Sequence, residues 1–235
     1  MRSFSDSELL NLWEDGSRRH SLDRALLILN AARPEMSYSD LADWPLGWRN
    51  RALADFRTRC FGPDLHAWAS CIQCAERLEF AMDGRLLAAV ESNNDTLAQV
   101  VVDGVVFRLP TSRDLAAATQ ETDARFASVR LLQNCCAEEA ASRIWSEGEM
   151  DQIGEVMAQV DPLAEIRLTL HCPQCAHEWD ECLDLAAFVW AEIDAEGRRL
   201  LLQIHSLAST YGWSEAQILA LSENRRALYL EMIQG

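Results

Sequence analysis

Two cysteine motifs of identical spacing constrain this chain more than any other feature of its sequence. They are two CxxC pairs at a constant offset of 101 residues, Cys71 with Cys74 and Cys172 with Cys175. A β-like stretch precedes each pair and another follows it, at 65–70 and 78–82 for the first pair and at 166–171 and 179–183 for the second. Each pair is therefore predicted to lie at the tip of a β-hairpin.

The two motifs match each other beyond their cysteines. At the same offset, Gln73, Ala75 and Asp83 correspond to Gln174, Ala176 and Asp184. In a hairpin knuckle two thiolates point to the same side of a tight turn and supply half of a tetrahedral shell, with Zn–S distances of about 2.3 Å. Two knuckles complete that shell. The sequence predicts one zinc site with all four cysteines as ligands, and a structural one, because four thiolates leave no open position for a water molecule.

The separation of the two motifs is unusually long for a zinc ribbon, with 97 residues between Cys74 and Cys172. Closing a loop of that length costs on the order of 4 kcal/mol, whereas structural zinc binds with roughly 10–16 kcal/mol. Zinc binding is therefore expected to outweigh the loop entropy and to hold together two hairpins that are distant in the sequence.

Other interpretations of these cysteines stay open at the level of sequence. The four cysteines could also be small buried apolar side chains, or the remains of a lost metal site in which side-chain packing has replaced the ion. The second motif resembles a thioredoxin-type redox motif, but such a motif begins a helix, whereas the residues after Cys175 favour a strand. Cys182 is near enough to act as a replacement ligand, and His171 or His177 to donate a hydrogen bond to a thiolate. The thiols outside the motifs fall in apolar stretches and are expected in the core: Cys60, Cys135, Cys136 and Cys182.

Charge and hydropathy exclude several classes of partner. The formal net charge is −16, from 37 acidic and 21 basic side chains. Such a surface repels phosphate, so neither nucleic acid nor an anionic membrane is an expected partner. The apolar runs are too short to span a bilayer, and the first residues form no signal sequence. A cytoplasmic location with reduced thiols is the expectation, which favours metal ligation over disulfides.

The first 60 residues have the pattern of helices. Ser5 and Glu8 form a capping box for the first helix. Ser21 is predicted to cap a second helix, which ends before Pro34. A third helix is predicted from about residue 47 to residue 60.

The middle of the chain predicts a hairpin followed by helices. Residues 91–96 are polar and read as a surface loop. Strands at 97–102 and 105–109 flank Asp103-Gly104, which is typical of a type I′ turn. Helical periodicity over residues 111–160, with Phe126 and Ile144 among its apolar positions, predicts about three helices.

The last 50 residues again predict helices. A long apolar face runs from residue 185 to a stop at Gly212. Ser214 with Gln217 forms a further capping box, and Ser222 is predicted to start a last helix through residue 232.

The expected fold is α+β and mostly α-helical, with a small zinc-ribbon-like β-hairpin module between helical segments. The predicted segments, in one compact body, are a helical segment at 1–64, a first knuckle hairpin at 65–90, a hairpin with a helical insertion at 91–165, a second knuckle hairpin at 166–184 and a helical segment at 185–235.

No motif of a catalytic apparatus is present. The chain lacks GxSxG, the P-loop, GxGxxG after a strand and HExxH, and its carboxylates are scattered along polar helix faces. We therefore expect neither enzymatic activity nor a small-molecule substrate.

Three stretches near the C-terminus carry a distinctive pattern. They read FVWAEID at 188–194, IHSLASTYGWSE at 204–215 and ILALSENRRALYL at 218–230. This pattern resembles a family of baseplate-associated proteins encoded with contractile phage tails and extracellular contractile injection systems, related to the baseplate hub assembly proteins of large contractile-tailed phages. The resemblance extends to the helical start, both knuckles and FRLPTSRDL at 107–115, and so covers most of the chain.

The resemblance implies a non-enzymatic role in building the baseplate or hub, with other baseplate or hub proteins as partners. From the residues alone, Trp213, Arg225, Arg226 and Tyr229 are candidates for contacting a partner, because Arg, Tyr and Trp dominate interface hot spots. Ion pairs of the two arginines with acidic residues of this chain are an equal alternative. Two other classes stay open: an acidic zinc-ribbon adaptor outside any tail system, and an enzyme that uses zinc or a dithiol.

Overall fold

The computed structural model describes residues 4–90, 99–137 and 143–234. Within these residues most of the chain is helical, and the strands form three separate two-stranded antiparallel sheets. The predicted mostly helical α+β fold is confirmed. None of the described helices is both long and apolar enough to cross a membrane.

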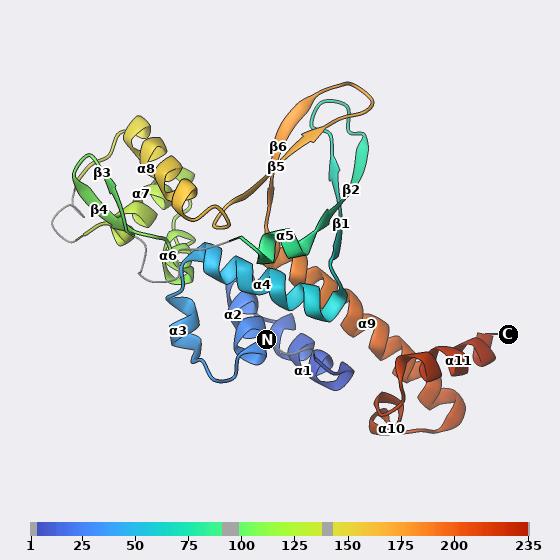
Figure 1. The fold of residues 1–235 in the computed structure, drawn as a ribbon. Coiled ribbons are helices and arrows are strands. Elements are labelled where there is room, and N and C mark those ends of the chain that lie inside the picture. Colours follow the sequence, from blue (N-terminus) through green and yellow to red (C-terminus); the bar gives the residue numbers. More distant parts are fainter. Residues whose placement is uncertain (1–3, 91–98, 138–142, 235) are drawn as a thin grey trace.

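A central helical body combines the first four helices of the chain with the long helix α9 (Figure 1). Its helices are α1 (Asp6–Ser17), α2 (Ser21–Ala32), α3 (Tyr38–Ala42), α4 (Leu46–Phe61) and α9 (Leu185–Tyr211). Leu29, Phe56 and Ile193, from α2, α4 and α9, lie fully buried in one shared core. The predicted first and last helical segments therefore fold around the same hydrophobic core.

Helices α1 and α9 approach closely because each offers a glycine to a tryptophan of the other. A Cβ on Gly16 would lie 2.4 Å from the ring of Trp190, and a Cβ on Gly197 would lie 2.6 Å from the ring of Trp13. The indole N–H of Trp13 donates to Asp194 Oδ1 at 2.7 Å. This reciprocal contact holds the N-terminal helix against the long C-terminal helix.

Two long hairpins rise from this body, and their tips meet (Figure 1). The first pairs β1 (Asp64–Ser70) with β2 (Arg77–Asp83), and the second pairs β5 (Ile166–His171) with β6 (Glu178–Leu183). The first hairpin follows α4 and leads into the short helix α5 (Gly84–Ala88), while the second leads directly into α9. Both predicted knuckle hairpins are therefore present, at almost the predicted residues.

The insertion between the hairpins has a core of its own. It contains β3 (Gln99–Val102), β4 (Val105–Arg108), α6 (Ser112–Ala118), α7 (Ala124–Cys135) and α8 (Glu147–Val160). Phe107, Leu132 and Ile153 are buried at its centre. Asp103 and Gly104 have φ angles of 49° and 78°, so the tight turn with two positive φ angles is confirmed.

Polar contacts join the insertion to the central body. The Leu46 N–H donates to Pro110 O at 3.0 Å, and the Gly47 N–H donates to Asp161 Oδ2 at 2.8 Å. The Asn50 amide donates to Leu163 O at 2.7 Å. The start of α4 is thus bound to the segment between β4 and α6 and to the C-terminal end of the insertion.

The C-terminal helices pack on the outer end of α9. Gly212 ends α9 in the left-handed conformation, with φ 69°, as the sequence predicts. Helix α10 (Glu215–Leu219) begins at the predicted capping box of Ser214 and Gln217, and α11 (Glu223–Gln234) follows. Leu10, Leu207 and Ile218 form a third buried cluster there, which includes residues of α1.

Several local predictions are wrong. His20, not Ser21, caps α2, since its ring nitrogen Nδ1 accepts the Leu22 N–H at 3.4 Å. Ile144 is 94% exposed and lies outside the helices, and Phe126 is exposed on α7. The sequence patterns predict no helix at α3, because this helix is too short to have a recognisable period. The surface loop predicted at 91–96 falls outside the described residues.

Candidate metal centre

The two cysteine turns have the same backbone geometry. In the first, the Cys71 N–H donates to Glu76 O at 2.8 Å and the Ala75 N–H donates to Cys71 O at 2.9 Å. In the second, the Cys172 N–H donates to His177 O and the Ala176 N–H to Cys172 O, at the same two distances. The alanine of each turn adopts a positive φ, 61° at Ala75 and 58° at Ala176. The matching residues of the two motifs thus occupy matching positions in two equivalent turns.

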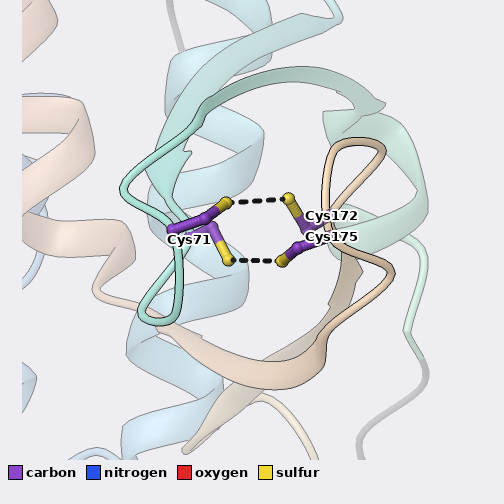
Figure 2. A group of neighbouring side chains, drawn as sticks. Cys71, Cys172 and Cys175 are labelled. Carbon is purple, nitrogen blue, oxygen red and sulfur yellow. Dashed lines mark hydrogen bonds between the residues drawn. The ribbon is translucent and has the colours of Figure 1, made fainter.

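The four sulfur atoms converge between the hairpin tips (Figure 2). Cys71 Sγ lies 3.6 Å from Cys175 Sγ, and Cys74 Sγ lies 3.6 Å from Cys172 Sγ. All four atoms lie within 4.8 Å of one another, and all four cysteines are free thiols. Sulfurs at about 2.3 Å from a central ion in a tetrahedral shell would lie about 3.8 Å apart. The structure therefore brings the four predicted ligands to a spacing that fits one metal ion.

Backbone amides of the turns point at the sulfur atoms. The amides of Cys74 and Gln73 donate to Cys71 Sγ, that of Glu76 donates to Cys74 Sγ, and that of His177 donates to Cys175 Sγ. N–H groups directed at sulfur favour the thiolate form. The amides thus lower the pKa values of the thiols they contact, but burial and the neighbouring thiols raise the pKa values of Cys74 and Cys175 overall.

The close approach of the four thiols gives Cys71 and Cys74 very different pKa values. Burial raises the pKa of Cys71, but the two amides and the neighbouring thiols outweigh it and lower that pKa to about 7. At Cys74 the Glu76 amide lowers the pKa, but burial and the three other thiols raise it to about 12. Once one thiolate has formed, the others resist ionisation because like charges would meet at close range. A bound cation removes this conflict, since a coordinated thiol is deprotonated.

The first cysteine of each motif is the buried one. Cys71 and Cys172 are 2% and 0% exposed, whereas Cys74 and Cys175 face solvent. Trp179 and Ala69 complete a small buried cluster with the two inner cysteines. Apolar side chains therefore support the site on one side, and the other side is open to an ion from solution.

The remaining thiols are not ligands. Cys182 is exposed on β6 and does not belong to the four-sulfur group, so its predicted core position is wrong. Cys135 is buried in the insertion, where burial and then Asp114 raise its pKa to about 12. Cys60 and Cys136 are half-buried. Of these four, Cys135 alone is a fully buried core thiol.

The histidines near the second knuckle do not support the ligands with their rings. The ring of His177 stacks on Trp179, with the ring centres 6.0 Å apart, and in the described part of the chain its Nε2 has no hydrogen-bond partner. His171 is exposed at the end of β5. A hydrogen bond from a histidine ring was only one alternative at the level of sequence, beside a solvated or core histidine, and it is the His177 backbone amide that lowers the pKa of Cys175.

The predicted partner-contact residues divide into three groups. Trp213 and Tyr229 are half-buried and pack edge to face, with ring centres 4.9 Å apart. Arg225 is exposed on α11. Arg226 is fully buried, forms an ion pair with Asp6 and donates to Leu221 O at 3.0 Å. Its proposed contact with a partner is therefore wrong, because its guanidinium is used to join α11 to α1.

The exposed face of α11 contains two apolar residues that the sequence analysis missed. Leu228 and Met232 are exposed, three and seven residues after Arg225. That spacing places the three side chains along one side of the helix. The spacing of these residues could be read from the sequence. The sequence did not show which side of α11 packs against its neighbours.

Comparisons with protein-family models, with curated proteins and with solved structures find nothing that matches this chain. The geometry of the four sulfur atoms and the surfaces around them are therefore the features that bear on the function of this protein.

Proposed function

We propose that Cys71, Cys74, Cys172 and Cys175 hold one structural zinc ion that clamps the two hairpins together. The observation that carries this proposal is the convergence of four sulfur atoms within 4.8 Å, from two turns of equal geometry. Zinc takes tetrahedral thiolate shells of this kind in structural sites. Four thiolates fill the shell, so the ion has no position for a reacting water and the protein is not an enzyme at this site.

Removal of single ligands tests this clamp. Elemental analysis by inductively coupled plasma mass spectrometry should find one equivalent of zinc in the purified protein. Cys71→Ser or Cys172→Ser should release the ion and destabilise the hairpins. Cys135→Ser is the matched control, because Cys135 is equally buried but lies in the core of the insertion. It should retain the zinc.

Two results would contradict the clamp: wild-type protein without metal after expression in zinc-supplemented medium, or a Cys71→Ser variant that still binds a full equivalent. If the purified protein contained one equivalent of iron instead of zinc, the four-cysteine site would stand and only the identity of the ion would change. Alkylation of the metal-loaded protein distinguishes a structural site, in which the thiols are protected, from an enzyme with a reactive thiol. Cys74 and Cys175 are exposed, and only coordination should protect them.

We further propose that the clamped protein is a non-enzymatic structural or hub-assembly protein of a contractile phage tail or phage-tail-like injection system. The support is the resemblance of segments 188–194, 204–215 and 218–230, which form both ends of α9 together with α10 and α11. The exposed face of Arg225, Leu228 and Met232 lies on the last of these helices. Its partners would be baseplate or hub proteins, met in the cytoplasm of the bacterium during assembly.

Deletion of the gene in a tail-producing strain tests this role. Electron microscopy should show particles without complete baseplates, and affinity purification of the wild-type protein should recover tail proteins. Arg225→Ala/Leu228→Ala should reduce that recovery, whereas Arg198→Ala, an exposed change on the neighbouring α9, should not. Complete particles and no recovered tail protein would favour the alternative, an acidic zinc-ribbon adaptor that binds another protein outside any tail system.

A further inference from the structure

A groove lies beside the clamp, between the two hairpins and the start of α9. It has a volume of about 550 Å³. Phe80 of the first hairpin, Leu168 and Leu183 of the second and Phe188 of α9 line it with half-buried apolar side chains. The groove is therefore a mostly apolar recess. The two hairpins that border it rise together from the helical body (Figure 1).

Two free strand edges border this groove. In the described residues β1 pairs with β2 alone, and β6 pairs with β5 alone. Five consecutive residues of β1, 66–70, line the groove, as do residues 181–184 at the end of β6. Side chains of consecutive residues point to opposite faces of a strand. Continuous runs of lining residues therefore indicate that the edges of β1 and β6 face the groove.

The register shows which backbone groups of β1 are free. Cys71 directs its N–H to Glu76 O, across the hairpin, and in an antiparallel pair this direction alternates along the strand. His66, Trp68 and Ser70 therefore direct their N–H and C=O groups away from β2. An unpaired edge of this kind is a template for another strand.

The far wall of the groove is acidic. Glu181 and Asp184 line it on the side of β6, and neither forms an ion pair with an arginine in the part of the chain that the structure describes. Glu181 accepts a hydrogen bond from the Trp179 indole at 3.3 Å, and Asp184 accepts one from the Ala187 N–H at 3.0 Å. On the outer face of β1, Trp68 is 61% exposed. Asp184 also interacts electrostatically with the buried Arg49, and the Arg77 guanidinium lies over the Trp68 ring, 4.7 Å from its centre. The free edge thus lies between two carboxylates and a large, partly exposed aromatic ring.

We propose that the free edge of β1 binds an extended segment of a partner protein in which basic and apolar side chains alternate. The backbone of that segment pairs with His66, Trp68 and Ser70 and adds a third strand to the first hairpin. Its basic side chains point into the groove, where their aliphatic parts contact Phe80 and their charges meet Glu181 and Asp184. Its apolar side chains fall on the opposite face and cover Trp68.

This inference deepens the proposed function, because the metal clamp holds the two hairpins at the separation that forms the groove. The two can nevertheless fail separately. Metal content is measured without any peptide, and the peptide is tested on protein already shown to contain its metal.

Fluorescence anisotropy with a labelled dodecapeptide of alternating Arg and Val tests the binding. Metal-loaded protein should bind it and should not bind the matching peptide of Glu and Val. His66→Pro removes one outward N–H from the β1 edge without affecting the pairing with β2, and should weaken binding about tenfold. Ala81→Pro is the matched control, because Ala81 stands directly opposite His66 and faces the other edge of the same hairpin. It should leave the dissociation constant unchanged.

A second pair of variants tests the charge. Glu181→Gln should weaken binding of the Arg peptide, and Glu178→Gln, an equal change on β6 outside the groove lining, should not. Hydrogen exchange gives an independent readout, since the peptide should slow exchange of the His66, Trp68 and Ser70 amides.

The proposal would be overturned by equal binding of the acidic and basic peptides, by equal loss in both proline variants, or by unchanged exchange at these three amides. Concentration-dependent dimerisation of the protein that His66→Pro abolishes would also overturn it, because the edge would then pair with a second copy of this chain.

Discussion

Each cysteine turn holds one alanine in the left-handed backbone conformation. Ala75 and Ala176 have φ angles of 61° and 58°, where a Cβ atom crowds the following carbonyl group. Glycine adopts this conformation without that penalty. The strain at both alanines is therefore a local cost that the hairpin pairing offsets, together with the metal ion where one is bound.

Replacing either alanine should stabilise the protein. Ala75→Gly and Ala176→Gly are each expected to raise the free energy of unfolding by about 1 kcal/mol, measured by urea titration of the metal-loaded protein. Ala195→Gly, at an exposed site inside α9, is the control and should lower it by about 0.5–1 kcal/mol. Losses of the same size at all three sites would contradict the strain argument.

At the scale of elements, a buried arginine positions the first hairpin. Arg57 of α4 donates two hydrogen bonds to Glu192 of α9, at 2.9 and 2.7 Å. It also donates to Gly62 O at 2.6 Å and to Asp64 O at 2.7 Å, where β1 begins. One guanidinium thus joins two helices to the base of a hairpin, and a single ammonium group cannot reproduce this geometry.

Arg57→Lys should lower the free energy of unfolding by about 2–4 kcal/mol, because it leaves Glu192 and two backbone carbonyls without their donor. Arg59→Lys is the matched control on the same helix. Its pair with Asp55 is exposed, so the change should stay within about 0.5 kcal/mol. Chemical denaturation of both variants measures the difference, and similar small effects would show that Arg57 is not a structural connection.

The start of α8 gives a pH-dependent element. The Ser146 backbone N–H and hydroxyl, followed by Arg143, lower the pKa of Glu149 from 4.5 to about 2. A carboxyl whose pKa is lowered by folding stabilises the native state above its unfolded pKa, and that stabilisation is lost as pH falls toward the folded pKa. The window for this group is therefore from about pH 4.5 down to about pH 2.

Glu149→Gln keeps an acceptor for the capping box but removes the titration. The stability of this variant should therefore fall less steeply than that of the wild type between those pH values, measured by urea titrations at a series of pH values. Glu155→Gln, on an exposed position of the same helix, should keep the wild-type slope. A wild-type slope in the Glu149 variant would show that its carboxylate does not stabilise the fold.

At the scale of the whole molecule, the packing of the helical core already brings together the two cysteine motifs that are distant in the sequence. Cys74 and Cys172 are separated by 97 residues, but α4 and α9 pack together in the core and place the bases of both hairpins close to each other. An ion bound by the four cysteines would then order only the two hairpin arms. The entropy cost expected from the sequence separation alone is therefore mostly met by the hydrophobic core before the metal binds.

Chelation of the metal should therefore act locally. Amides of the two hairpins, 64–83 and 166–183, should exchange faster after treatment with a strong chelator, while those of α2, α4 and α9 keep their protection. Hydrogen exchange with mass spectrometry measures this, and α8 in the separate core of the insertion is the internal control. Equal loss of protection in α4 and α9 would show that the metal supports the entire fold.

The sequence by itself determined the local features of this protein. The CxxC spacing, the flanking strands, the Asp103-Gly104 turn and the capping residues all act within a few positions, so their geometry follows from neighbouring residues. The prediction that the four cysteines come together is also confirmed, and the signal for it was that the two motifs repeat the same pattern.

Only the tertiary structure decided the contacts between distant segments. Arg226 is buried against Asp6, Arg57 joins α4 to Glu192, and the free edge of β1 faces the acidic end of β6. No local pattern specifies such pairs, because they depend on how the helices pack around a shared core. The same packing left Leu228 and Met232 exposed and placed four sulfur atoms from opposite halves of the chain around one point.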